Sequence, residues 1–279
     1  MEKVKIVADS TCDLSPEVLE RYQIEVIPLR VNLGEKPCLD GVDVHPADLF
    51  AHVRETGKLP TTSAPTPAYY EDLYRKWTEE GYSFVHFSFC LSFPVTHNIA
   101  KMAAQSFSNV YPVDSRNISA GMGILAIQAA KLRDEGLSAQ EIAERTRVMA
   151  ERVQTSFILD TLQYMHKGGR CTGVAALGAN LLNLKPCIEV KDGSMEVGKK
   201  YRGKLESVLE QYTEARLKGK EHLDLDQILI AHCYVEQQIL DRVIQKIKEC
   251  QPFRRWVKRL AECRNYNAIS CFFYDRQTG

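Results

Sequence analysis

Residues 4–22 read VKIVADSTCDLSPEVLERY, a short apolar run followed by hydroxyl-bearing residues and then by a helix start signal. Val4–Ala8 has the length and composition of a buried strand. In Ser15-Pro16-Glu17, a serine takes the N-cap position of a helix and a proline its first turn. A strand followed directly by a helix is the repeating unit of α/β sheets.

The same alternation continues to about residue 150. We expect strands at Glu25–Leu33, Ser83–Phe89 and Val110–Val113. The spacing predicts helices at Pro46–Glu55, Pro67–Glu80, Thr96–Gln105 and Ser119–Glu135, with another opened by the capping box Ser138-x-x-Glu141. Short apolar strands between amphipathic helices predict an α/β layer with a mostly parallel sheet.

From about Gln154 the pattern changes. Two strand-like segments meet at Asp192-Gly193, a dipeptide typical of a tight hairpin turn. A long helix (Lys204–Lys218), a strand (Gln227–His232) and a further helix (Glu236–Cys250) follow. We therefore predict an N-terminal α/β domain over residues 1–155 and a mixed α/β domain over residues 156–279.

Composition excludes several classes of function. The chain has 36 basic and 36 acidic residues, so no overall field attracts nucleic acid or an anionic membrane. No apolar run approaches the ~18–20 residues that span a bilayer. The start, MEKVKIVADS, has no apolar signal-peptide segment. We expect a cytoplasmic protein without a membrane span.

The nine cysteines form no C-x-x-C pair, and the seven histidines show no metal-ligand spacing. The cysteines are expected to be reduced and to pack as small apolar side chains, without a metal site. Gly121–Ala126 matches G-x-G-x-x-A, but the match lies inside a predicted helix, where close helix packing explains the glycines better than a nucleotide. G-x-S-x-G is absent, so nucleophilic catalysis lacks support.

Hydroxyl groups follow several predicted strands. Ser10-Thr11, Cys90–Thr96 and Asp114-Ser115 stand where parallel strands end, at the edge where α/β proteins bind ligands. The loop PTTSAPTP (Pro60–Pro67) adds four more hydroxyls between three prolines. Hydroxyls and helix N-termini suit a carboxylate or phosphate. Each hydroxyl taken singly is better explained by a helix cap or a turn, but four such loops at one edge favour a ligand site.

Several of these segments together resemble the DegV family of bacterial fatty-acid-binding proteins. DSTCDL (Asp9–Leu14) resembles its amino-terminal signature, and PTTSAPTP its Thr-Ser-x-Pro loop. VDS (Val113–Ser115) resembles an internal Asp-Ser of the family. The most specific match is LDTLQYMHKGGRCTGVAALGANLLNLKPCIEVKDG, Leu159 to Gly193.

The resemblance implies two α/β domains that bury a long-chain fatty acid, such as palmitate or oleate, between them. Thr62, with Thr61 beside it, matches the threonine that binds the carboxylate, and Ser92 or Thr96 falls near a second hydroxyl loop. The resemblance also implies a role as carrier for a separate fatty acid kinase, which would form an acyl phosphate for phospholipid synthesis. Arg170 and Arg202 fall where family members present positive charge to the kinase. The resemblance thus implies no catalytic residue and no cofactor, the fatty acid being the bound ligand.

Two departures from the family pattern leave alternatives open. Pro94 stands where relatives carry a serine, and the chain ends NAISCFFYDRQTG without the His-x-Gly-Pro-Gly loop whose histidine reaches the carboxylate. His232 belongs to an earlier strand. Besides the fatty acid carrier, two hypotheses therefore remain. The protein is an enzyme or sensor for a small anionic metabolite, or it is a degenerate module that binds a partner but no lipid.

Overall fold

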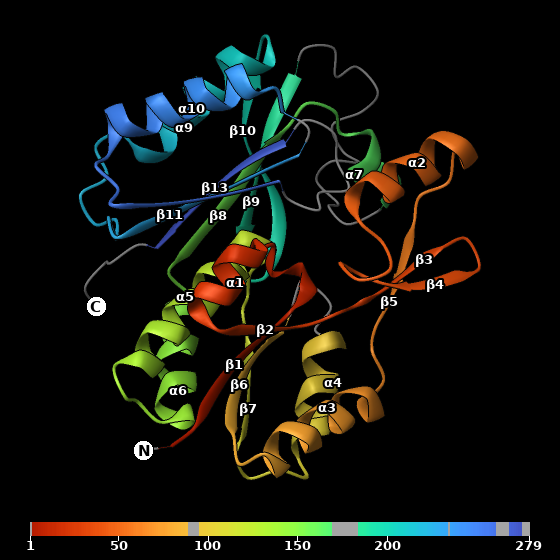
Figure 1. Cartoon of the computed structure of the whole chain (residues 1–279). Helices are drawn as coiled ribbons and strands as arrows, with labels where there is room; N and C mark the ends of the chain where they lie inside the picture. The colour runs from red at the N-terminus through yellow and green to blue at the C-terminus, as the bar shows by residue number, and fades with distance from the viewer. Residues whose placement is uncertain (1, 89–94, 169–183, 234, 261–267, 275–279) are drawn as a thin grey trace. The chain divides into compact units, whose positions relative to one another are not determined.

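The computed structural model describes residues 2–88, 95–168, 184–233, 235–260 and 268–274 (Figure 1). The chain divides into two compact units, Met1–Val153 and Gln154–Gly279. The predicted boundary between two independently folding domains, after residue 155, stays a prediction. Among the described residues, no helix has both the length and the apolar character needed to cross a membrane.

The first unit contains a four-stranded sheet in which every neighbouring pair is parallel. Its order is β2-β1-β6-β7, formed by Ile24–Ile27, Val4–Asp9, Ser83–Ser88 and Val110–Asp114. The α/β architecture with a parallel sheet in this half is thus confirmed. Because adjacent strands run the same way, the segments that follow β1, β6 and β7 leave from one edge of the sheet.

Helices cover both faces of this sheet (Figure 1). On one face lie α3 (Pro67–Glu79) and α4 (Val95–Ala104), and on the other α1 (Pro16–Tyr22), α5 (Ala120–Asp134) and α6 (Ala139–Ala150). The predicted Ser138 capping box forms at the start of α6. Under α3 and α4 the core is aromatic, with Tyr70, Tyr74 and Phe84 fully buried.

Gly123 explains the G-x-G-x-x-A match. A Cβ atom at this position would lie 2.6 Å from the carbonyl oxygen of Cys12 and 2.7 Å from a side-chain carbon of Leu14. Those residues belong to, or follow, the 3-10 turn η1 (Ser10–Cys12) after β1. The glycine therefore lets α5 approach that turn closely, as predicted, and the motif needs no nucleotide.

The first unit contains a second sheet, of three strands, which the sequence analysis did not predict. It has the antiparallel order β4-β3-β5, formed by Lys36–Leu39, Arg30–Leu33 and Thr61–Ser63. The single strand expected at Glu25–Leu33 is wrong, because β2 and β3 belong to different sheets. Pro28 stands between them, and proline cannot donate a ladder hydrogen bond. Helix α2 (Pro46–Thr56) packs Leu49 against this sheet.

The second unit is a mixed six-stranded sheet of order β10-β9-β8-β13-β11-β12. Its strands are Ser194–Arg202, Leu184–Lys191, Val153–Leu159, Ala268–Tyr274, Gln227–Cys233 and Arg255–Leu260. The predicted hairpin is confirmed: Asp192 and Gly193 join β9 to β10 with φ of 49° and 71°. The helices of this unit are α7 (Gln163–Gly168), α9 (Leu205–Leu217) and α10 (Gln237–Cys250), the last two on one face of the sheet (Figure 1).

Candidate functional site

The serines that follow the parallel strands are used in the fold. Ser10 Oγ donates to Asp40 Oδ2 at 2.6 Å and accepts from the backbone N–H of Leu29 at 3.2 Å. Ser115 Oγ donates to the carbonyl oxygen of Ser88 at 3.1 Å. These two hydroxyls therefore fix the ends of strands, which is the ordinary role of serine in turns.

Thr11 differs from its neighbour Ser10. Its Oγ1 is buried and has no hydrogen-bond partner within the described residues. A buried hydroxyl without a partner loses its hydration without compensation. A ligand oxygen at this sheet edge would supply the missing partner. In the sequence, the position of Thr11 directly after the first strand indicates a ligand site, but nothing there separates Thr11 from Ser10.

A buried polar network lies beneath the same edge. Asp9 Oδ1, at the end of β1, accepts from Tyr70 Oη at 2.9 Å and lies 3.1 Å from His86 Nε2. The other ring nitrogen of His86 lies 2.7 Å from Tyr74 Oη. Burial, and then the nearby Asp9 charge, raise the pKa of both Tyr70 and Tyr74. Both phenols stay protonated, so the network joins β1, β6 and α3 by satisfied hydrogen bonds.

The threonines singled out for the carboxylate lie in strand β5 rather than in a loop. Thr62 is paired directly with Val31 of β3, and Thr61 with Asn32. Because side chains alternate along a strand, Thr62 shares a face with Val31, whereas Thr61 and Ser63 point to the other face. All three β5 side chains are exposed, and no hydrogen bond to their hydroxyls occurs in the described part of the chain. They are free to bind a ligand.

The face that carries Thr62 is otherwise apolar across the sheet. Val31 stands between Thr62 on one side and Cys38 on the other, and both Val31 and Cys38 are buried. With Val44 and Leu49 they form a small hydrophobic cluster. Thr62 is thus a hydroxyl at the rim of an apolar surface.

The opposite face is polar over β3 and β5, with Leu39 and Pro37 of β4 beside it, and it includes a residue that the sequence analysis missed. Arg30 is paired directly with Ser63, next to the Asn32–Thr61 pair, and its side chain is exposed. No acidic partner of Arg30 occurs among the described residues. The one signal in the sequence is the alternation within Arg30–Leu33, and it identifies a face only when the partner strand is known.

The remaining predicted residues lie in several places. Thr66 caps α3, as expected, with Oγ1 accepting from the backbone N–H of Tyr69 at 3.3 Å. Thr96 is half-buried in the first turn of α4, and no hydrogen bond within the described residues joins it to β5. Arg202 ends β10 and is exposed. Ser92, Pro94 and Arg170 lie outside the described residues.

No metal site emerges from the described ranges, which hold no group of three or more His, Cys, Asp or Glu that could bind an ion.

Known proteins resemble this chain over most of its length. The family model "Uncharacterised protein, DegV family" matches residues 3–261. A DegV domain-containing protein of Clostridium acetobutylicum is 36% identical over 205 residues, which cover 73% of this chain and 74% of that protein. One from Clostridium perfringens is 32% identical over 212 residues, 75% of each chain.

Solved structures agree with the sequence relatives. A DegV family protein from Thermus thermophilus, described by its fatty acid binding, matches with a TM-score of 0.83 and 26% identity over 98% of this chain and 99% of that one. A stearic acid-binding protein from Eubacterium ventriosum has a TM-score of 0.77, with 23% identity and full coverage of both chains, 100% each. The second likeness shows the fold alone.

Proposed function

The chain belongs to the DegV family, and on that premise we propose that it binds a long-chain fatty acid and presents the carboxylate to a separate fatty acid kinase. Fatty acid binding by the related Thermus thermophilus protein supports the first half of this proposal. Palmitate and oleate are the expected ligands. The acyl phosphate that the kinase forms would enter phospholipid synthesis.

The observation that carries the proposal is the position of Thr62. Its side chain is exposed, makes no hydrogen bond within the described residues, and shares a face with Val31 and Cys38. A fatty acid needs both features, because its carboxylate must keep hydrogen bonds when it leaves water while its chain seeks apolar contact. Since Thr61 points to the other face of β5, Thr62 is the primary carboxylate ligand in this proposal.

The acyl chain supplies most of the affinity. Burying about fifteen methylene groups at ~0.8 kcal/mol each yields on the order of 12 kcal/mol before the cost of ordering the chain. The hydrogen bond from Thr62 fixes the orientation of the carboxylate and adds a smaller, charge-assisted contribution.

In the carrier role the chemistry belongs to the kinase. The kinase transfers the terminal phosphoryl group of its nucleotide to a carboxylate oxygen, and this chain holds that oxygen in place. Arg202 at the end of β10, and Arg170, are proposed to contact the kinase. Positive side chains at such a surface mainly raise the association rate.

Lipid analysis of the purified protein tests fatty acid binding. Native mass spectrometry should show one bound acyl chain, and solvent extraction should release palmitate, oleate or a close relative. Protein stripped of lipid should take up added oleate. If neither the purified nor the stripped protein holds any fatty acid, the carrier proposal is wrong and the degenerate module is favoured.

A kinase assay tests the partner. With a purified bacterial fatty acid kinase, Arg202→Glu should slow acyl phosphate formation about tenfold without changing oleate affinity, because the charge acts on association. Arg254→Glu makes the same change at another exposed arginine of the second unit and should have no effect. Equal rates for the two variants would remove Arg202 from the kinase contact.

One observation favours a second candidate, a small anionic metabolite as ligand. Strands β3 and β5 place Arg30, Asn32, Thr61 and Ser63 together on one face of their sheet. Arg30→Gln separates the two candidates. A fatty acid held at Thr62 should lose little affinity when Arg30 is neutralised, whereas a small anion on the polar face should lose at least tenfold, the loss expected for a charge-assisted contact.

A further inference from the structure

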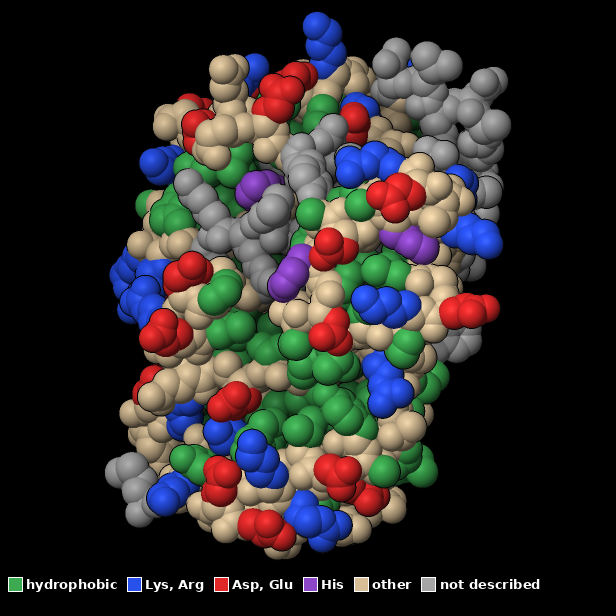
Figure 2. All heavy atoms as spheres, turned by 45° about the vertical axis from the view of Figure 1, so that its right-hand side comes forward, with side chains coloured by type: hydrophobic (Ala, Val, Ile, Leu, Met, Phe, Trp, Pro, Cys, Tyr) green, Lys and Arg blue, Asp and Glu red, His purple; other side chains and the backbone are tan. Residues whose placement is uncertain are grey.

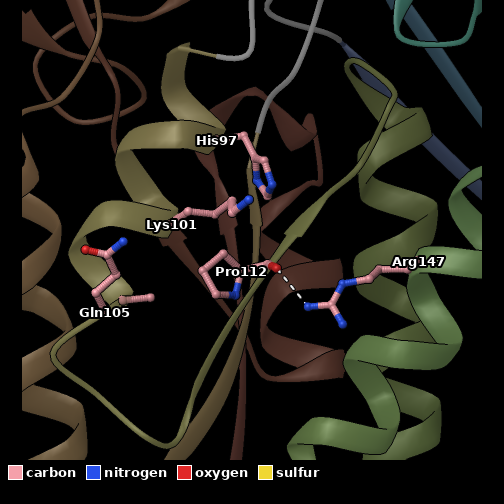
Figure 3. Close-up of a pocket in the computed structure, with 6 residues that line it drawn as sticks. His97, Lys101, Gln105, Pro112 and Arg147 are labelled. Atoms are coloured by element: carbon pink, nitrogen blue, oxygen red, sulfur yellow. Dashed lines mark hydrogen bonds between the residues drawn. The ribbon is translucent and has the colours of Figure 1, made fainter.

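A pocket of about 480 Å³ lies across the outer edge of β7 (Figure 3). Its walls come from both faces of the sheet, because α4 supplies one side and α6 the other. The residues that line it are His97, Lys101, Ala104, Gln105, Pro112 and Arg147. Figure 3 shows the His97 ring, the Lys101 amine and the Arg147 guanidinium directed toward the same space in front of Pro112.

The pocket holds two permanent cations, Lys101 and Arg147. Arg147 Nη2 donates to the carbonyl oxygen of Pro112 at 3.2 Å, which holds the guanidinium against the strand, and its other donors make no hydrogen bond within the described residues. No ion pair of Arg147 or Lys101 occurs among the described residues. Elsewhere in the same unit, Arg116 pairs with Glu151 at 3.1 Å. Two neighbouring cations without a carboxylate repel each other, and an anion between them removes that repulsion.

The formal net charge of the chain is zero, and Figure 2 shows acidic and basic side chains interspersed on the face in view. The positive pocket is therefore a local feature and not part of a general basic surface. Its positive field also reaches His97. Burial lowers the pKa of that imidazole, and Lys101 and Arg147 lower it further against the opposing effect of Asp114.

His97 supplies a third donor. Its Nδ1 lies 2.8 Å from Ser88 Oγ. When the serine hydroxyl donates to Nδ1, the neutral ring carries its hydrogen on Nε2. No hydrogen-bond partner of Nε2 occurs within the described residues. In that tautomer the Nε2–H group of His97 can donate a hydrogen bond to a ligand.

We propose that this pocket binds a phosphate group, held between Lys101 and Arg147 with His97 as an additional donor. Two fixed positive charges match a phosphate dianion, whereas a carboxylate carries one charge and offers its two oxygens in one plane. The pocket is much larger than a phosphate ion and falls in the size range of small-molecule sites. The phosphate therefore belongs to a larger molecule, either a soluble phosphate ester or a phospholipid headgroup.

The test follows the His97 ring signals by NMR in the full-length protein while inorganic phosphate is added, with His97→Gln used to assign them. Wild-type protein should show a saturable shift. The double variant Lys101→Gln/Arg147→Gln should bind phosphate at least tenfold more weakly. Lys58→Gln/Arg54→Gln removes the same charges at exposed positions in and just after α2, and should leave the affinity unchanged.

Vesicle sedimentation separates the two sources of phosphate. Phosphatidylcholine vesicles that contain phosphatidate should retain wild-type protein but not the Lys101/Arg147 double variant if the ligand is a headgroup. If the vesicles retain neither while free phosphate still binds, the ligand is a soluble ester. No shift of His97 with phosphate, or equal weakening in the Lys58/Arg54 control, would overturn the proposal. The result does not depend on fatty acid binding, because Thr62→Val protein should give the same phosphate titration.

Discussion

Two groups of polar side chains in the first unit differ in what they bind. The hydroxyls of β5 are exposed and make no hydrogen bond within the described residues. The network of Asp9, Tyr70, Tyr74 and His86 is buried, and the distances between its hydrogen-bonded atoms lie between 2.7 and 3.1 Å. In the network, polar groups satisfy one another. In β5 the hydroxyl groups remain available for a ligand.

The sequence alone does not separate the two groups. Asp9 stands at the end of β1 and Tyr70 in the first turn of α3, positions as typical of a ligand site as those of the β5 hydroxyls. Only the hydrogen-bond partners of these side chains, which the structure shows, distinguish the two groups. Substitutions in the buried network should lower stability, whereas substitutions in β5 should change binding and leave stability unchanged.

The largest expected effect is at Asp9. Asp9→Ala leaves Tyr70 Oη and His86 Nε2 without their buried acceptor, and should lower the free energy of unfolding by about 3–5 kcal/mol. Urea unfolding measures it. Asp72→Ala, on the surface of α3, is the matched control and should have little effect. If Asp9→Ala lowers the free energy of unfolding as little as Asp72→Ala does, the buried network does not stabilise the fold.

A smaller loss is expected where α5 meets the turn after β1. Gly123→Ala places a Cβ atom 2.6 Å from the carbonyl oxygen of Cys12, so the helix must shift. Overpacking of this kind costs about 1–3 kcal/mol, measured again by urea unfolding. Stability within about 0.5 kcal/mol of wild type would show that the contact between α5 and the turn after β1 does not need a glycine.

His97 is half-buried, and its Nδ1 lies 2.8 Å from Ser88 Oγ. Burial first, then Lys101, His86 and Arg147, lower its pKa, while Asp114 raises it. The unfolded chain therefore takes up a proton more readily, and the free energy of unfolding should fall as the pH drops through the ordinary histidine value of about 6.5. His97→Gln should flatten this dependence in buffers free of phosphate. An unchanged pH profile would show that His97 is not the titrating group.

The smallest effect is expected in β5 itself. Thr61→Val and Ser63→Ala remove exposed hydroxyls that have no partner within the described residues, so unfolding free energies should stay within about 0.5 kcal/mol of wild type. Thermal or urea unfolding measures both. A loss as large as that of Asp9→Ala would mean that β5 hydroxyls serve the fold.

Local signals in the sequence predict the elements well. The proline at the start of α1, the Ser138 capping box and the Asp192-Gly193 turn each act within a few residues, and the structure confirms each. Ser15 takes the N-cap position of α1 but makes no side-chain capping bond. The parallel sheet follows from the alternation of strands and helices.

What the sequence could not predict depends on distant pairing. Thr62 meets Val31 only because β5 pairs with β3, and Asp9 meets His86 across 77 residues. The phosphate pocket joins His97 of α4 to Arg147 of α6 across the edge of β7. Hydrophobic periodicity carries no information about such contacts.

The central claim is that the Thr62 hydroxyl binds the fatty acid carboxylate. The most direct measurement compares oleate affinity in wild type, Thr62→Val and Thr62→Ser, together with the carboxyl carbon signal of ¹³C-labelled oleate. Valine keeps the shape and strand preference of threonine without the hydroxyl, so Thr62→Val should lose at least tenfold in affinity and shift that signal, with unchanged stability. Thr62→Ser should restore both. Wild-type affinity and an unshifted carboxyl signal in Thr62→Val would contradict the claim.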